Sequence, residues 1–197
     1  MTLILASNSP RRKELLINAG VPLRIIPADI DEESVSFKKP AKAVLTLARL
    51  KAENVYERVK DEDPPPLVLG ADTLVYLKGA ILGKPKDINE AREMLRALNG
   101  QDHDVFTGYA FIGPISQAQN VARTKVRIRA LNSEEIEFYL RTLEPLDKAG
   151  AYAVQGEYGQ TVIERIHGSL TNVIGLPLPE VLATYRVLKA EMEKARS

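Results

Sequence analysis

The sequence contains no cysteine, no long run of apolar residues and almost no excess of either charge. Without cysteine, neither disulfides nor thiolate metal sites can form, structural zinc included, and the composition suits a reducing cytoplasm. No stretch approaches the roughly 20 apolar residues that a membrane-spanning helix needs. The short run LILA, residues 3–6, also differs from a signal peptide core, because the arginines follow it instead of preceding it. We therefore expect a cytoplasmic protein that does not bind a membrane.

The charge balance argues against a nucleic acid partner. Lys and Arg together number 27 and Asp and Glu number 26, so no broad basic surface is available for a phosphate backbone. Any positive charge that matters must be local. With 197 residues, of which 45% are hydrophobic, the chain can bury a sizeable core. We predict one folded domain over residues 1–197.

Strand and helix signals alternate along the chain and predict a mixed α/β fold. Apolar runs predict strands at residues 3–6, 23–26, 105–112, 117–129, 151–156 and 161–168, and either a strand pair or one long bent strand at 67–77. Helical spacing and capping residues predict helices at 10–19, 40–58 and 178–194, after Asp87 with Glu90, and after Asn132 with Glu135. The hairpin-like pair at 105–129 argues against a purely parallel sheet. We expect a mixed central sheet flanked by helices.

The stretch ASNSPRR, residues 6–12, follows the first predicted strand and opens the first predicted helix. Ser9 is a good N-cap and Pro10 suits the first helical position, so the first backbone N–H groups of the helix point toward the end of the strand. Anions bind at such positions, and an arginine fork can grip phosphate oxygens in a bidentate manner. Arg11 and Arg12 would supply that fork, and Ser7 a hydroxyl. In the alternative interpretation, Ser9 only caps the helix and both arginines lie on a solvated face.

Two lysines are candidates of lower specificity. Lys84 in GAILGKP is not part of a P-loop, because only three residues separate the glycines and Pro85 follows the lysine. By itself the pattern indicates a turn with an exposed lysine. Lys51, in LARLKAEN on a predicted helix, would by default be an ordinary surface lysine.

The acidic residues are more specific candidates than the two lysines. Asp72 interrupts the apolar run VLGADTLV, so its carboxylate is either buried at a cost or directed into a cleft. Glu32, in IDEES, belongs to an acidic loop of a common kind. Together the two carboxylates could hold a hard divalent cation such as Mg²⁺. His103 and His167 show no metal-binding pattern, and we interpret both as structural.

These segments together resemble the Maf proteins, a family of nucleoside triphosphate pyrophosphatases once described as septum formation inhibitors. The family's order and spacing are matched by LASNSPRRKELL, DIDEES, LARLKA, GADTLV, LGKP, MLRALNG, HDVFTG, DKAGAYAVQG and NVIGLPL. The resemblance implies a single Maf-like domain with two lobes around a nucleotide cleft, similar to inosine triphosphate pyrophosphatases, and a homodimer. The site residues that it implies are Ser7, Arg11, Arg12, Glu32, Lys51, Asp72, Lys84 and Gln155.

The chemistry of these residues suits the reaction that the resemblance implies. A triphosphate carries roughly three to four negative charges, which the basic residues Arg11, Arg12, Lys51 and Lys84 would offset. A divalent cation, Mg²⁺ or alternatively Mn²⁺ or Co²⁺, on Asp72 and Glu32 would polarise the α-phosphate. Asp72 would orient or deprotonate the attacking water. The expected products are a nucleoside monophosphate and pyrophosphate.

The base preference follows from a comparison within the family. One subgroup prefers 7-methylguanosine triphosphate, and the positions of Arg11, Thr73 and Gln155 look like Trp, Gln and Glu in it. The Trp ring face and the Glu carboxylate both attract a cationic base. Arg11 would instead repel that base. The carboxamide of Gln155 offers a donor and an acceptor that match O4 and N3–H of uracil or thymine, whereas cytosine presents the reverse pattern. Tyr152 could pack near the base or lie in the core. We therefore expect dTTP and UTP as substrates.

Two other functions are compatible with a nucleotide site. A nucleotidyltransferase would transfer the nucleotide to an acceptor, but such enzymes usually begin with a glycine-rich loop, which LILASNSPRR lacks. A regulator of cell division or septum formation could bind nucleotide without essential catalysis. The intact set of acidic and basic residues argues against lost catalysis.

Overall fold

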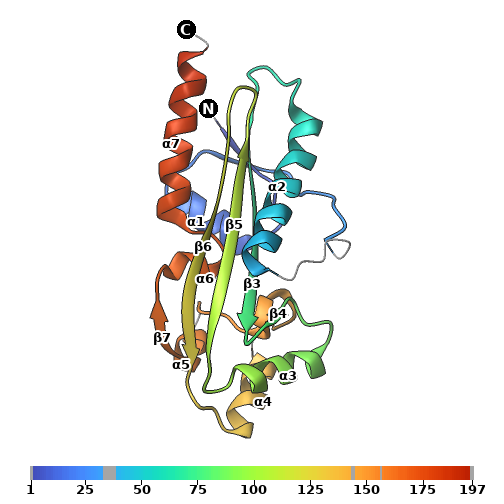
Figure 1. Cartoon of the computed structure of the whole chain (residues 1–197), viewed down its shortest axis with the longest axis vertical. Helices are drawn as coiled ribbons and strands as arrows, with labels where there is room; N and C mark the ends of the chain where they lie inside the picture. The colour runs from blue at the N-terminus through green and yellow to red at the C-terminus, as the bar shows by residue number, and fades with distance from the viewer. Residues whose placement is uncertain (1, 33–38, 143–144, 156, 196–197) are drawn as a thin grey trace. The chain divides into compact units, whose positions relative to one another are not determined.

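The structure is a computed structural model that describes residues 2–32, 39–142, 145–155 and 157–195 (Figure 1). It divides into two compact units, each assembled from several stretches of the chain. Unit 1 comprises Met1–Asp72, Thr107–Ala122 and Gly175–Ser197, and unit 2 comprises Thr73–Phe106 and Arg123–Ile174.

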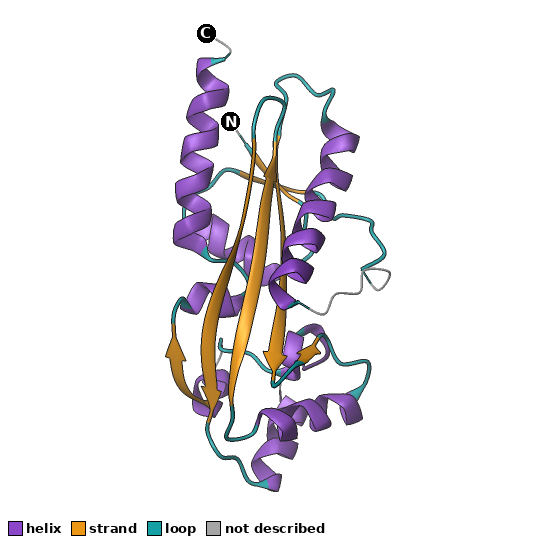
Figure 2. Cartoon of the chain, viewed as in Figure 1, coloured by secondary structure: helices purple, strands orange, loops and turns teal. Residues whose placement is uncertain are grey.

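The described strands form one mixed sheet, as predicted (Figure 2). Their order is β2-β1-β3-β5-β6-β7, with β4 paired to β3. The strands are β1 (Leu3–Leu5), β2 (Leu23–Ile25), β3 (Leu67–Leu77), β4 (Ala80–Leu82), β5 (Asp102–Ile112), β6 (Gln117–Ile128) and β7 (Ile163–His167). β1 is parallel to both β2 and β3, whereas β4 and β7 are antiparallel to their neighbours. β3, β5 and β6 contribute residues to both units.

In unit 1, helices cover both faces of the strands. Leu3 and Leu5 belong to a buried cluster with residues of α1 (Pro10–Asn18) and α7 (Leu178–Lys194). Ile4 and Ala6 point the other way and pack with residues of α2 (Pro40–Val59). This alternation follows from the period of two along a strand. Figure 1 shows α2 and α7 on opposite sides of these strands.

Two glycines let α2 lie directly against the sheet. A Cβ atom added to Gly70 of β3 would lie 2.1 Å from the carbonyl oxygen of Ala48, and one added to Gly108 of β5 would lie 2.5 Å from the carbonyl carbon of Val44. Real Cβ atoms do not approach backbone so closely, so a side chain at either position would push the helix away. The helix that carries Lys51 is therefore held close to the strand that carries Asp72.

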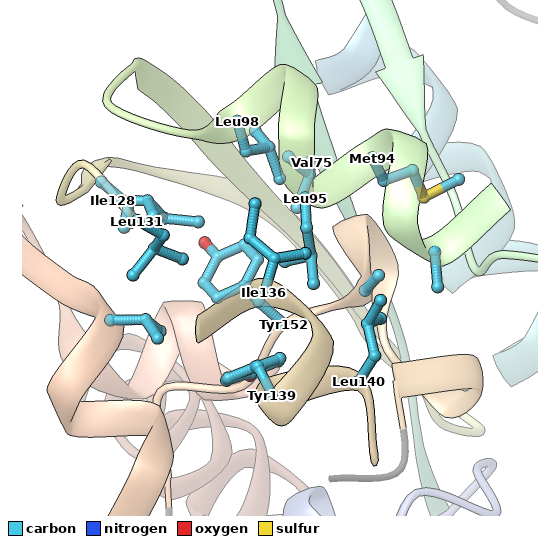
Figure 3. Close-up of a cluster of buried hydrophobic side chains, with 14 of the residues drawn as sticks. Val75, Met94, Leu95, Leu98, Ile128, Leu131, Ile136, Tyr139, Leu140 and Tyr152 are labelled. Atoms are coloured by element: carbon cyan, nitrogen blue, oxygen red, sulfur yellow. The ribbon is translucent and has the colours of Figure 1, made fainter. Parts of the chain in front are cut away.

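Unit 2 has its own apolar core, drawn in Figure 3. The helices that contribute to it or flank it are α3 (Ile88–Leu98), α4 (Ser133–Thr142), α5 (Glu157–Val162) and α6 (Leu170–Ile174), with short 3₁₀ turns at Pro145–Asp147 and Ala149–Ala151. Leu95 and Leu98 of α3 pack with Ile136 and Leu140 of α4 in this core. Tyr152 lies in the same cluster, which confirms the interpretation of that residue as part of the core.

Local signals placed the starts of α3 and α4 correctly. The side chain of Asp87 accepts hydrogen bonds from the N–H groups of Asn89 and Glu90, and Asn132 and Glu135 form the reciprocal capping box that the spacing predicts. In a capping box, the carboxylate of Glu90 would accept a hydrogen bond from the backbone N–H of the N-cap residue Asp87. At α3 it accepts instead from the backbone N–H of Lys86.

One predicted strand is wrong. Residues 151–155 of the segment AYAVQG contain no strand: Ala151 ends a 3₁₀ turn and the chain then runs without regular structure. Gly150 and Ala151 have φ angles of 70° and 61°, which no β-strand accommodates. In TVIERIHG, Thr161 and Val162 belong to α5, and the predicted strand begins only at Ile163. Among the described residues, no helix has both the length and the apolar character required to span a membrane.

Candidate functional site

The strongest candidate residues of unit 1 gather beyond the end of β1. β1 pairs with β2 on one side and β3 on the other, so the order of the strands along the chain reverses at β1. Open α/β sheets bind ligands just past the carboxyl ends of the strands at such a reversal. Leu5 ends β1 opposite Leu69 of β3, and the N–H of Ala6 still donates to the carbonyl of Leu69. Ser7 follows β1, and Asp72 lies within β3 three residues past Leu69, so both residues lie beyond the last β1–β3 pair.

The turn into α1 is built around two serine hydroxyls. Ser9 caps α1 and its Oγ accepts a hydrogen bond from the backbone N–H of Arg12, as predicted. Ser7 Oγ accepts from the backbone N–H of Ser9 at 3.1 Å and from Nη1 of Arg12, also at 3.1 Å. Both lone pairs of the Ser7 hydroxyl are thus used, so this hydroxyl acts toward a further group as a donor. A phosphate oxygen is a suitable acceptor.

Arg12 is buried and held in place. Its Nε donates to the carbonyl oxygen of Gly175 at 2.8 Å, and only 8% of the residue is exposed. Burial lowers the pKa of the Arg12 guanidinium, and the carboxylate of Asp72 opposes that shift. The guanidinium nonetheless stays protonated at neutral pH. The alternative in which both arginines lie on a solvated face is therefore wrong for Arg12.

Lys51 forms the centre of a charged cluster. Its Nζ lies 2.7 Å from an oxygen of Asp72 and 2.9 Å from an oxygen of Glu32. Lys51 and Asp72 are both buried, whereas about half of the Glu32 side chain is exposed. The default interpretation of Lys51 as a surface lysine is wrong, because α2 turns this residue toward β3. The sequence thus brings three of its predicted site residues into direct contact.

The two carboxylates of this cluster could hold a divalent cation. Asp72, on β3, and Glu32, in the loop after β2, both contact the ammonium of Lys51, so the two carboxylates can approach one cation. Their oxygen donors suit Mg²⁺, which typically takes one or two carboxylates and completes its shell with water and phosphate. The described residues contain no cluster of three or more His, Asp or Glu ligands. Two carboxylates could therefore supply only part of the coordination of such a cation.

Arg11 adds positive charge beside this cluster. It is half-buried, and its charge lowers the pKa of neighbouring Arg12. Arg11, Arg12 and Lys51 thus contribute three positive charges in unit 1, against two negative charges from Asp72 and Glu32. Binding a polyphosphate at this edge would offset the excess.

The other three predicted site residues belong to unit 2. Thr73 and Gln155 are half-buried, and Lys84 is exposed, as its turn-like sequence indicates. The turn that contains Lys84 is tied down, because the carbonyl of Gly83 accepts a hydrogen bond from Gly150 N–H at 3.0 Å. That these three residues act together with the cluster of unit 1 stays a prediction.

Several supporting residues escaped the sequence analysis. Gly175, whose φ of 132° excludes most other residues, presents the carbonyl that orients Arg12, and Gly70 sets the distance between α2 and β3. Both lie inside motifs that carry the family resemblance, NVIGLPL and GADTLV, but a motif match does not say what its glycines contact. His103 is buried and bonded to the hydroxyl of Tyr152, as expected for a structural histidine.

The family model described as "Maf-like protein" matches residues 2–188 of this chain. The chain belongs to the Maf family. Among curated Maf relatives, a protein named dTTP/UTP pyrophosphatase from Anaeromyxobacter dehalogenans is 46% identical over 188 residues, covering 93% of this chain and 92% of its own length. A protein of the same name from Bacillus cereus is 41% identical over 193 residues, covering 98% of each chain.

A solved structure with partial similarity to this Maf chain is that of the Staphylococcus aureus Ham1 protein. It has a TM-score of 0.43 and 14% identity, and the match covers 65% of this chain and 72% of that chain. The family assignment therefore rests on the sequence comparisons, and the mixed α/β fold on the sheet described above.

Proposed function

We propose that this Maf protein hydrolyses dTTP and UTP to the nucleoside monophosphate and pyrophosphate. Relatives that are 41% and 46% identical over almost the whole chain carry the name dTTP/UTP pyrophosphatase. The observation that carries the proposal is the contact of buried Lys51 with Asp72 beside buried Arg12. Cations and a carboxylate at the end of β1 are what phosphate binding and water activation together require.

In this proposal the basic residues bind the triphosphate. The guanidinium of Arg12, fixed by Ser7 and Gly175, holds phosphate oxygens, and the hydroxyl of Ser7 donates to one of them. Arg11 and Lys84 add positive charge. Because Arg12 is already held in one rotamer, little side-chain entropy is lost when it binds phosphate.

The acidic residues serve the chemical step. Asp72 orients a water molecule toward the α-phosphorus and accepts a proton from it, while Lys51 keeps Asp72 in place. The new bond joins the water oxygen to the α-phosphorus, and the bond from that phosphorus to the bridging oxygen breaks, releasing pyrophosphate. Asp72 and Glu32 would hold a divalent cation, Mg²⁺ or alternatively Mn²⁺ or Co²⁺, whose chemistry is to polarise the α-phosphate.

The preference for dTTP and UTP is assigned to unit 2 and Arg11. The carboxamide of Gln155, with Thr73 nearby in the proposed site, matches O4 and N3–H of uracil and thymine. Arg11 disfavours the cationic base of 7-methylguanosine triphosphate. Cytosine would leave polar groups unpaired unless the side-chain amide of Gln155 flipped, so that its donor and acceptor ends exchanged places.

Three broader features complete the proposal. We expect residues 1–197 to act as one Maf-like domain that contains both units, the protein to be a homodimer, and its location to be the cytoplasm. The family resemblance supports the first two, and the absence of cysteine suits the third.

The test is to incubate the purified protein with UTP or dTTP and Mg²⁺, without any acceptor, and to identify the products. A pyrophosphatase yields monophosphate and pyrophosphate in equal amounts, and in heavy-oxygen water the label enters the monophosphate. The variant Asp72→Asn should fold normally, as judged by circular dichroism, and retain less than about a tenth of the activity, a loss above about 1.4 kcal/mol in transition-state stabilisation.

The outcomes separate this function from the alternatives. A nucleotidyltransferase would release pyrophosphate only after an acceptor is added. A regulator of division without catalysis would bind UTP and leave it intact. Either result, or an Asp72→Asn variant as active as the wild type, would contradict the proposal.

A further inference from the structure

The segment that leads to Gln155 lacks the backbone pairing of a helix or strand. Residues 152–155 form neither element, so their N–H and carbonyl groups cannot bond within a regular ladder. Yet Tyr152 and Val154 are buried, at 5% and 9% exposure. Something other than secondary structure must therefore fix the path of this segment.

Two buried side chains of unit 2 hold it. The hydroxyl oxygen of Tyr139, on α4, accepts a hydrogen bond from the backbone N–H of Ala153 at 2.7 Å. The hydroxyl of Tyr152 bonds to Nε2 of His103, on β5, also at 2.7 Å. Tyr139 and His103 are 2% and 3% exposed, and Figure 3 shows Tyr139 and Tyr152 in one apolar cluster.

Both anchors are made by neutral groups at neutral pH. Burial lowers the pKa of His103 to about 4 and raises the pKa of Tyr139 to about 12. Burial also raises the pKa of Tyr152. The hydrogen bonds therefore persist near neutral pH, and the bond between His103 and Tyr152 is buried away from water.

We infer that Tyr139 and the His103–Tyr152 pair are positioning residues for Gln155, and that through it they set the discrimination between uracil and cytosine nucleotides. The inference rests on the proposed function, in which the Gln155 amide reads the pyrimidine edge. An amide discriminates only while its donor and acceptor ends cannot exchange places. Ala153, which Tyr139 anchors, precedes Gln155 by two residues. Loosening it gives the amide the freedom to satisfy cytosine.

The first variant is Tyr139→Phe, which removes the hydroxyl and keeps the ring in the core. The measurement is the ratio of kcat/KM for UTP to kcat/KM for CTP. We expect this ratio to fall roughly fivefold, the size of effect that one buried hydrogen bond supports, chiefly through a lower KM for CTP. Tyr152→Phe removes the other anchor in the same way and should lower the ratio in the same direction, which keeps the test open if one variant folds poorly.

Tyr109→Phe is the matched control. It also removes a buried tyrosine hydroxyl, one that lies 3.3 Å from Thr184 Oγ1 in unit 1. A general loss of stability would affect both nucleotides alike and leave the ratio unchanged. We therefore expect Tyr109→Phe to keep the wild-type ratio whatever its melting temperature.

Combination with Gln155→Ala tests whether the anchor acts through Gln155. In the Gln155→Ala background, Tyr139→Phe should change the ratio no further, because the group that it positions is gone. An unchanged ratio in both Tyr139→Phe and Tyr152→Phe, or a full additional effect in the Gln155→Ala background, overturns the inference. A wild-type protein that hydrolyses neither UTP nor dTTP overturns the proposed function instead, so the two failures are distinguishable.

Discussion

Arg12, Lys51 and Asp72 are charged residues that unit 1 keeps largely out of water, and each has a specific partner. Lys51 and Asp72 bond directly, and Arg12 is held by Ser7 and Gly175. Replacing a buried ion pair by apolar residues is often neutral or stabilising, so such a group is weak evidence for stability. The presence of these three buried charged residues near the end of β1 is better explained by the chemistry that we propose.

The burial of His103 predicts that the free energy of unfolding decreases at acid pH. Burial lowers its pKa to about 4, below the value of about 6.5 in an unfolded chain. Between these two values the unfolded chain binds a proton that the folded chain does not. The free energy of unfolding contributed by His103 therefore falls as the pH falls through this window and is constant above it. When the pH falls from about 7 to about 4.5, the free energy of unfolding of the wild type should decrease by about 2 to 3 kcal/mol more than that of His103→Gln.

Urea denaturation at the two pH values measures this difference. The exposed His167 supplies the control, since His167→Gln should lose as much free energy of unfolding as the wild type between the same pH values. Equal losses in the wild type and in His103→Gln would contradict the burial of a neutral His103.

At the scale of single residues, the sequence predicts the role of a side chain when that role depends on hydrogen bonds to neighbouring residues. Ser9 caps α1 because its hydroxyl needs only the N–H three residues ahead. The burial of Lys51 depends on Asp72, 21 residues away, and that of Arg12 on Gly175, 163 residues away. No local pattern reports such contacts, so sequence reasoning from the residues alone made Lys51 a surface residue.

At the scale of elements, the approach of α2 to β3 determines the geometry of the charged cluster. Gly70→Ala places a methyl group 2.1 Å from the carbonyl oxygen of Ala48, so helix and strand must separate. We expect the free energy of unfolding to fall by about 3 kcal/mol, the upper part of the range for overpacking. Lys51 and Asp72 lie on the two separated elements, so kcat should fall as well.

Gly83→Ala is the control for chemical denaturation of this variant. A Cβ atom at Gly83 meets nothing within 4 Å, and its backbone conformation is open to alanine. Its free energy of unfolding should stay the same or rise slightly. If Gly70→Ala were as stable as Gly83→Ala, the close packing of α2 on β3 would be wrong.

The elements themselves were largely predictable because each carries its own periodicity or cap. The buried strands, the helices α1, α2, α3, α4 and α7, and the β5–β6 hairpin were found in this way, whereas the short elements β4, α5 and α6 were missed. The prediction for AYAVQG failed because its run of four apolar residues resembles a short buried strand. The positive φ angles at Gly150 and Ala151 prevent a strand, and alanine gives no local signal of such a conformation.

At the scale of the whole molecule, the order of the strands explains why distant motifs carry one function. The reversal at β1 brings residues of α1, α2, β3 and the turn after β1 together beyond the end of β1. Periodicity predicts strands but not their order, so this arrangement could be anticipated only through the family resemblance. The resemblance also supplied Thr73, Lys84 and Gln155, whose part in the site stays a prediction.

The most direct test of the account is the set of kcat/KM values for dTTP, UTP, CTP and 7-methylguanosine triphosphate, measured with Mg²⁺ and with the products identified. We predict the highest values for dTTP and UTP, a lower value for CTP, and the release of pyrophosphate and monophosphate from each substrate. A higher kcat/KM for 7-methylguanosine triphosphate than for either dTTP or UTP would contradict the account.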